Sequence, residues 1–164
     1  MLAFWKTRKA RRAATGAIAP FVGQTRQRLG HIPDQTWSAP YVIGFIGTLI
    51  TLYAEQDASA LDSDDLAAVQ TGAWSEITEA DSILLGEDLC FLSSSGEATF
   101  ELGCSNALSF FEALRILDMK RRESVFDTMG ELPAAPDVND ETGALLWRRY
   151  FDDYLGRFSA PAVD

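Results

Sequence analysis

An unbroken apolar stretch at residues 40–54 constrains the fold more than any other part of this 164-residue chain. With no charged residue, it is apolar on nearly every side of a helix, so a helix there has to be covered by the rest of the protein. It is also shorter than the roughly 20 residues that cross a bilayer. We therefore predict a buried central helix over residues 40–55, with Pro40 in its first turn.

Small and hydroxyl-bearing residues follow one another at helical spacing along this predicted helix. They are Gly44, Gly47, Thr48 and Thr51. Small residues on one face allow a second helix to approach closely. The alternative is a groove for a small ligand, lined by the same four residues.

The remaining sequence is also patterned for helices. Apolar residues recur three and four positions apart over residues 18–29, 62–79, 105–122 and 141–158. Residues 83–92 favour a shorter helix, but a turn-rich stretch at 93–97 leaves a small β-hairpin near residues 88–102 as an alternative. The sequence thus predicts a mainly α protein, a single-domain bundle of five to seven helices with this one hairpin left open.

Aromatic residues line one side of the last predicted helix, residues 141–158. They are Trp147, Tyr150, Phe151, Tyr154 and Phe158. Large rings in a chain of this size favour core packing over the stacking of nucleic-acid bases. The opposite side is charged, and Arg148 is spaced to pair with Asp152 one turn later.

Charge is distributed very unevenly along the chain. Residues 1–33 contain seven basic residues and no acidic one, and the first carboxylate is Asp34. The remaining 131 residues hold seven basic residues and all 24 acidic ones, which gives them a net charge of −17. Such asymmetry is typical of a basic arm attached to an acidic body. We therefore predict an N-terminal arm at residues 1–16 and a single acidic helical domain at residues 17–164.

The predicted arm combines aromatic and basic side chains, which are the candidate site for a partner or a membrane. They are Phe4, Trp5, Lys6, Arg8, Lys9, Arg11 and Arg12. Tryptophan suits a membrane interface, and each base adds about 1 kcal/mol near an anionic surface. Docking on an acidic protein surface, including the protein's own body, and a tail without a task are the alternatives. Nucleic acid is disfavoured because the body is acidic.

Motifs for catalysis or cofactor binding are missing from the sequence. His31 is the sole histidine, and it is far in sequence from Cys90 and Cys104, so no transition-metal spacing is present. The two cysteines favour reduced thiols over a structural bridge. No glycine-rich phosphate loop occurs. The sequence therefore predicts no metal and no cofactor, and it disfavours an enzyme.

The expected function is that of a non-catalytic helical interaction protein whose basic, aromatic arm contacts a protein partner or an anionic membrane surface. A small-ligand-binding protein or enzyme that uses the Gly44–Thr51 groove is the second hypothesis, and a homo-oligomer is a third. Without a recognisable secretory signal, a cytoplasmic location is expected. An acid-free, arginine-rich head also fits an organelle transit peptide, so import stays open if the source is eukaryotic.

Overall fold

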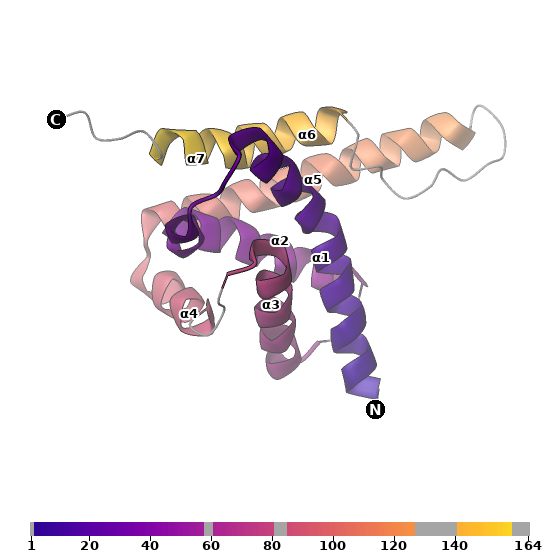
Figure 1. The fold of residues 1–164 in the computed structure, drawn as a ribbon. Helices are drawn as coiled ribbons and strands as arrows, with labels where there is room; N and C mark the ends of the chain where they lie inside the picture. The colour runs from indigo at the N-terminus through magenta and orange to yellow at the C-terminus, as the bar shows by residue number, and fades with distance from the viewer. Residues whose placement is uncertain (1, 58–60, 81–84, 127–140, 159–164) are drawn as a thin grey trace.

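The computed structural model describes residues 2–57, 61–80, 85–126 and 141–158, and all regular structure in these ranges is helical (Figure 1). The mainly α prediction is confirmed. The elements are α1 (Leu2–Leu29), the short 3-10 helix η1 (Asp34–Ser38), α2 (Pro40–Asp57), α3 (Ser63–Thr78), α4 (Leu85–Ser95), α5 (Ala98–Phe126), α6 (Glu141–Trp147), the π-helical turn η2 (Arg148–Asp152) and α7 (Asp153–Phe158).

The β-hairpin alternative near residues 88–102 is wrong, because α4 and α5 occupy this region with a tight turn between them. Gly96 reverses the chain with a φ of 63°. The Glu97 carboxylate then accepts a 2.6 Å hydrogen bond from the Phe100 N–H, which starts α5 and lowers the pKa of Glu97. Within the stretch read as a hairpin turn, Ser95 therefore ends α4, Gly96 makes the turn and Glu97 caps α5, which begins seven residues before the predicted start.

Helix α2 lies at the centre, and its most extensive contact is with α5. The two backbones approach so closely that neither Gly44 nor Gly103 has room for a side chain. A Cβ atom on Gly44 would lie 2.4 Å from the Phe100 carbonyl oxygen, and one on Gly103 would lie 2.3 Å from the Tyr41 carbonyl oxygen. This crossing confirms the prediction of a buried central helix, since Tyr41 through Gly47 are all buried.

Aromatic rings from five helical segments, α1, α2, α5, α6 and η2, meet beside this crossing. The Trp147 ring stacks on Phe21 of α1 with centroids 5.1 Å apart. It also lies 5.6 Å from Phe45 of α2, 5.6 Å from Phe110 of α5 and 4.7 Å from Phe151 of η2. Trp147 and Phe151 are almost fully buried. The predicted packing role of the aromatic stripe is thereby confirmed for these two rings.

A buried polar cluster ties the C-terminal helices to α1. Trp147 Nε1 donates to Thr25 Oγ1 at 2.9 Å, and Thr25 Oγ1 donates to Asp152 Oδ1 at 2.6 Å. Arg28 forms an ion pair with the other oxygen of Asp152. The predicted Arg148–Asp152 pair is wrong, because the π-helical turn lies at residues 148–152 and Asp152 points inward to α1.

The close approach of α2 and α5 predicts that Gly103→Ala destabilises the protein by about 1–3 kcal/mol, because the new methyl group overlaps backbone that cannot move away easily. Gly16→Ala is the matched control, since a Cβ on this helical glycine of α1 meets nothing within 4 Å. It should stabilise by up to about 1 kcal/mol through helix propensity. Urea denaturation of both variants measures the difference, and an unchanged midpoint for Gly103→Ala contradicts the packing.

The buried polar cluster predicts that Thr25→Val costs about 1–3 kcal/mol, because the Trp147 N–H loses its acceptor in a buried site. Thr15→Val is the control. Its hydroxyl also donates to a carboxylate, that of Glu76 at 2.9 Å, but the pair is exposed. A change below about 0.5 kcal/mol is expected there. Equal losses in thermal unfolding would show that burial of the cluster is not what stabilises it.

Candidate functional site

The segment predicted as an arm is folded as the first half of α1, and it packs along α3. Ala10 and Ala14 are fully buried, and Thr7 Oγ1 donates to Asp65 Oδ1 of α3 at 3.0 Å. The helix continues without interruption through residue 16. The structure thus gives these residues a helical form that the sequence analysis did not foresee, and the two helices run side by side in the same direction (Figure 1).

Arg11 belongs to this packed side of the helix. Its Nε atom lies 3.2 Å from Glu76 Oε1, close enough for an ion pair although not aligned as a hydrogen bond. Its side chain crosses Gly72 of α3, where a Cβ atom would lie 2.7 Å from Arg11 Cδ. The charge of Arg11 is therefore used within the fold and separated from the other candidate residues.

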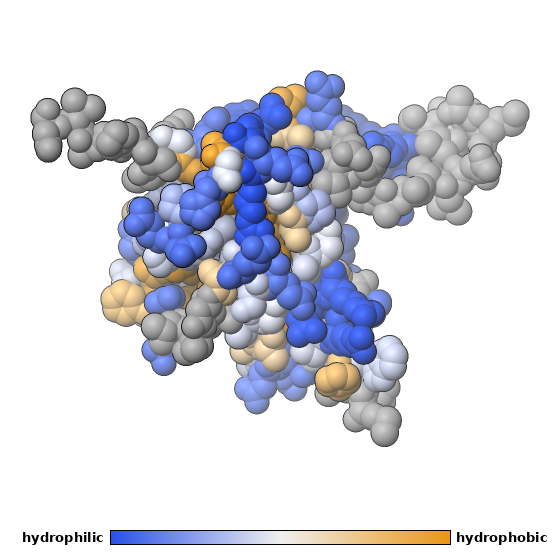
Figure 2. Space-filling view, viewed as in Figure 1, coloured by the Kyte–Doolittle hydropathy of each residue, from blue (hydrophilic) through white to orange (hydrophobic). Residues whose placement is uncertain are grey.

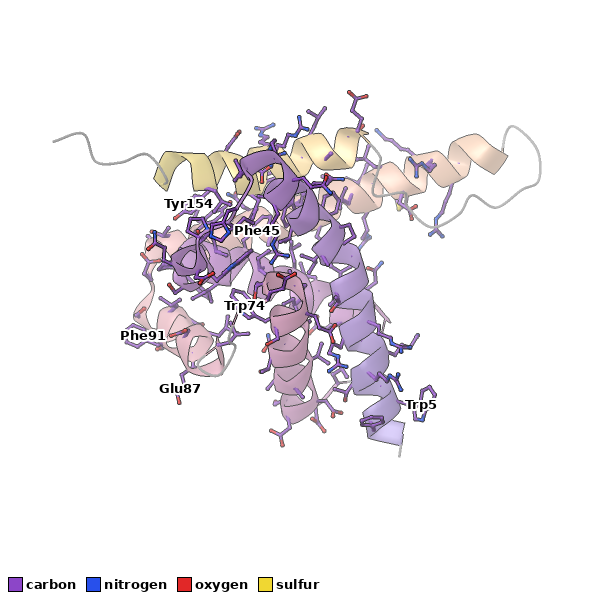
Figure 3. The ribbon with its side chains drawn as sticks, in the orientation of Figure 1. Trp5, Phe45, Trp74, Glu87, Phe91 and Tyr154 are labelled. Atoms are coloured by element: carbon purple, nitrogen blue, oxygen red, sulfur yellow. The ribbon has the colours of Figure 1, made fainter. Side chains whose placement is uncertain are left out.

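The other six candidate residues form what we call the outer basic face of α1. It comprises Phe4, Trp5, Lys6, Arg8, Lys9 and Arg12. At 100° per residue, Trp5 and Arg12 lie opposite the buried Ala10 and Ala14. Phe4 is 70% exposed and Trp5 is 67% exposed, and Trp5 points away from the body (Figure 3). Hydrophilic side chains gather over this half of α1 in the space-filling view (Figure 2).

Three of these bases have no charge partner. Lys6, Arg8 and Arg12 are exposed, and none forms an ion pair within the described ranges. The nearby acids Asp65 and Glu76 are instead engaged by the packed side of α1. The face is convex, so it can lie on a surface but cannot enclose a small substrate.

The Gly44–Thr51 stripe is filled by neighbouring helices. The Phe100 backbone of α5 covers Gly44, and Leu89 of α4 lies 3.2 Å from a Cβ position on Gly47. Thr51 accepts a 2.9 Å hydrogen bond from Gln70 of α3, and Thr48 is half-buried. These contacts confirm the close-approach interpretation. They leave no room for the ligand groove beside Gly44 and Gly47, so that hypothesis is dropped.

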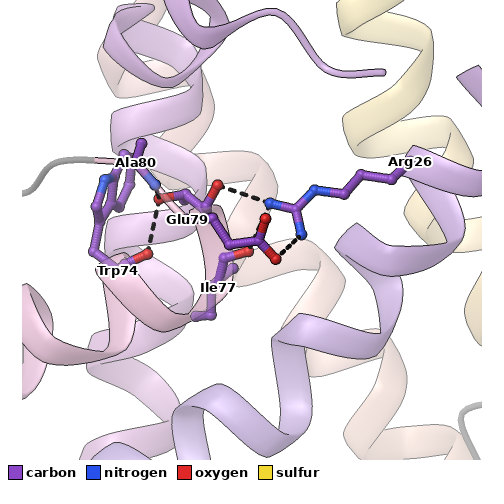
Figure 4. A network of polar contacts seen from close by, with 6 residues as sticks. Arg26, Trp74, Ile77, Glu79 and Ala80 are labelled. Atoms are coloured by element: carbon purple, nitrogen blue, oxygen red, sulfur yellow. Dashed lines mark hydrogen bonds and ion pairs between the residues drawn. The ribbon is translucent and has the colours of Figure 1, made fainter. Parts of the chain in front are cut away.

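A cavity of about 410 Å³ opens elsewhere, where η1, α2, α3 and α4 meet. Its lining comprises Asp34, Trp37, Ser38, Ile43, Trp74, Glu79, Ala80, Leu85 and Asp88. Beside it, Arg26 forms a 2.9 Å ion pair with Glu79 and donates to the Thr78 carbonyl at 2.7 Å (Figure 4). The sequence analysis missed this site, because its residues come from four segments that share no spacing pattern.

Other chemistry is sparse in the described ranges. No group of three or more histidine, cysteine or acidic side chains there is placed to hold a metal ion. Cys90 is exposed, Cys104 is half-buried, and both are free thiols. Within the same ranges, no helix has both the length and the apolar character that crossing a membrane requires.

Comparison of the chain with models of known protein families, with curated proteins and with solved structures found no match.

The packing of α1 on α3 predicts that Ala10→Glu loosens the N-terminal half of α1, because it puts a carboxylate into a fully buried position. Cleavage by trypsin measures this local loosening, since all the candidate bases lie in residues 6–12. Cleavage there should accelerate by at least about tenfold, as expected for a local loss of roughly 1.4 kcal/mol or more.

Gly16→Glu is the control for this experiment. It adds the same charge at an exposed position of the same helix with open space around it. Its cleavage rate should stay close to that of the unmodified protein. If both variants are cleaved at the same rate as the unmodified protein, the N-terminal half of α1 is not held on α3 in solution.

Proposed function

We propose that this protein is a non-catalytic helical interaction protein that binds anionic membrane surfaces through the outer basic face of α1. The observation that carries the proposal is an exposed tryptophan, Trp5, on the same side of a folded helix as Arg8 and Arg12, which form no ion pair within the described ranges. At 100° per residue, Trp5, Arg8, Lys9 and Arg12 share one side of the helix, and Lys6 lies at the edge of this side, one turn before the buried Ala10. The rest of the chain, which is strongly acidic, would face away from the membrane.

The expected strength of the contact follows from the number of bases. Lys6, Arg8 and Arg12 together give at most about 3 kcal/mol at an anionic bilayer, and Trp5 adds an interfacial anchor. That total corresponds to weak, reversible binding with a dissociation constant in the millimolar range. Binding should also weaken as salt rises, because the bases are exposed.

A membrane suits this face better than a protein groove does. The face is a single convex helix side with two exposed rings, Phe4 and Trp5, at its start and no continuous apolar stripe, so it offers little area to a partner that recognises shape. A lipid surface requires only charge and an interfacial ring. An acidic protein surface is the competing occupant, and it is separated by the experiment below.

We predict that replacing Lys6, Arg8 and Arg12 together by glutamine lowers partitioning onto vesicles of phosphatidylcholine with 30% phosphatidylserine by roughly 100-fold, from about 1 kcal/mol for each lost charge. Vesicle co-sedimentation at low salt measures it. The matched control replaces Arg115, Lys120 and Arg149, three exposed bases elsewhere, by glutamine. This control makes the same change in net charge and should bind as the unmodified protein does.

The aromatic part of the face is tested by Trp5→Ala, with Phe91→Ala of α4 as its control. Both rings are about equally exposed, 67% and 70%. Only Trp5→Ala should weaken vesicle binding. Equal binding to vesicles without phosphatidylserine, or equal loss in the two triple variants, contradicts the proposal. No vesicle binding at low salt would leave an acidic protein surface as the occupant to seek.

Point substitutions are a cleaner test than removal of residues 1–16. Deletion would also take away Ala10 and Ala14, both fully buried, and the contacts of Thr7, Arg11 and Thr15 with α3. A truncated chain would therefore lose stability together with the outer basic face.

A further inference from the structure

The cavity between η1, α2, α3 and α4 combines two indole rings with carboxylates. Trp37 and Trp74 are buried core residues that also form part of its lining, together with Ile43 and Leu85. Its volume of about 410 Å³ lies within the roughly 300–1,000 Å³ typical of small-molecule sites. The apolar and aromatic lining therefore offers space for a compact ligand.

The charge of the lining selects among ligands. Asp34, Glu79 and Asp88 line the cavity, and no basic residue is among its described lining residues. Glu79 is neutralised by Arg26. Asp34 and Asp88 have neither an ion pair nor a hydrogen bond to the side chains of the described ranges. An anion would be repelled here, whereas a cation would be attracted by both carboxylates.

The aromatic walls favour the same kind of ligand. The face of an indole ring attracts cations, and Trp is the strongest of the aromatic residues in this respect. The Arg26 guanidinium lies over the Trp37 ring at 6.0 Å from the centroid, so one face of this ring already carries a cation. The indole rings and the neighbouring carboxylates therefore both favour a cationic ligand.

We propose that this cavity binds a small organic cation, an ammonium group carried on a compact apolar body, with Trp37 and Trp74 against the body and Asp34 and Asp88 facing the charge. The site is separate from the outer basic face of α1 in position and in the sign of its charge. Loss of vesicle binding would leave it intact.

Choline and its uncharged analogue 3,3-dimethylbutan-1-ol test the proposal on the full chain, since they have nearly the same shape and differ in charge. Indole N–H signals in ¹H–¹⁵N spectra, assigned with single Trp→Phe variants, report the location. Choline should shift Trp37 and Trp74 in a saturable manner at millimolar concentration and leave Trp5 and Trp147 unchanged. It should bind at least about tenfold more tightly than the alcohol.

Two carboxylates in the first turn of α4 supply a matched pair of variants. Asp88 lines the cavity, whereas the exposed Glu87 points away from it (Figure 3). Asp88→Asn should weaken choline binding about tenfold, and Glu87→Gln should not change it. Both remove one charge from the same helix end, so a pure helix-dipole role predicts equal behaviour.

Three results would overturn the proposal. They are equal affinity for choline and the alcohol, comparable shifts at all four indoles, and equal choline affinity in the Asp88→Asn and Glu87→Gln variants. The first comparison uses only the unmodified chain, so it decides the matter even if a variant is unstable.

Discussion

The contact between the backbones of α2 and α5 is the interaction on which the rest of the structure depends. Gly44 and Gly103 let the two helices touch at their main chains, where any larger side chain would force them apart. This spacing puts Phe45 and Phe110 within reach of a common centre, with their rings 6.1 Å apart. Trp147 then closes the cluster from the C-terminal helices, so the position of α6 and η2 follows from the α2–α5 crossing.

The two halves of α1 pack against the rest of the protein through different kinds of contact. Its second half joins the aromatic cluster through Phe21 and the polar cluster through Thr25. Its first half has only two alanines and a few polar contacts with α3. This half packs on α3 through its small residues, and nothing in the described ranges covers its opposite side. Trp5 is therefore exposed on an ordered helix. Function proposed for the outer basic face thus depends on weak packing beneath it.

The sequence pattern predicted which helices exist better than it predicted where they begin. The apolar stretch at 40–54 predicts α2 because so many apolar residues in a row have to be buried. The predicted helix at 62–79 corresponds to α3, which Asp62 caps by accepting a 2.8 Å hydrogen bond from the Asp65 N–H. The true start of α5 was missed because Glu97 is an uncommon cap and the serines before it also suit a turn. The first half of α1 was missed because alanine contributes little to any hydrophobic pattern, although it packs well.

The outer basic face could be predicted in part from the sequence, whereas the cavity could not, because only the face is formed by residues close together in the chain. The bases of residues 6–12 are neighbours in sequence, and because a helix puts successive residues 100° apart, Arg8, Lys9 and Arg12 come to share the side of Trp5. The separation of Arg11 from them depends on Gly72 and Glu76, which no local pattern connects with it. The cavity could not be predicted from the sequence, since Trp37 and Trp74 are brought to it only by tertiary packing.

The uneven charge of the sequence becomes a spatial separation through the pairing of α1 with α3. Along this interface, acids of α3 and of the turn after it meet partners on α1: Asp65 meets Thr7, Glu76 meets Arg11 and Thr15, and Glu79 meets Arg26. Among the described residues, the charged side chains without such a partner lie outside this α1–α3 interface. The unpaired bases of α1 therefore face outward, whereas the unpaired Asp34 and Asp88 belong to the cavity at η1 and α4. Pairing along one helix interface thus engages acids of α3 and leaves the outer side of α1 cationic.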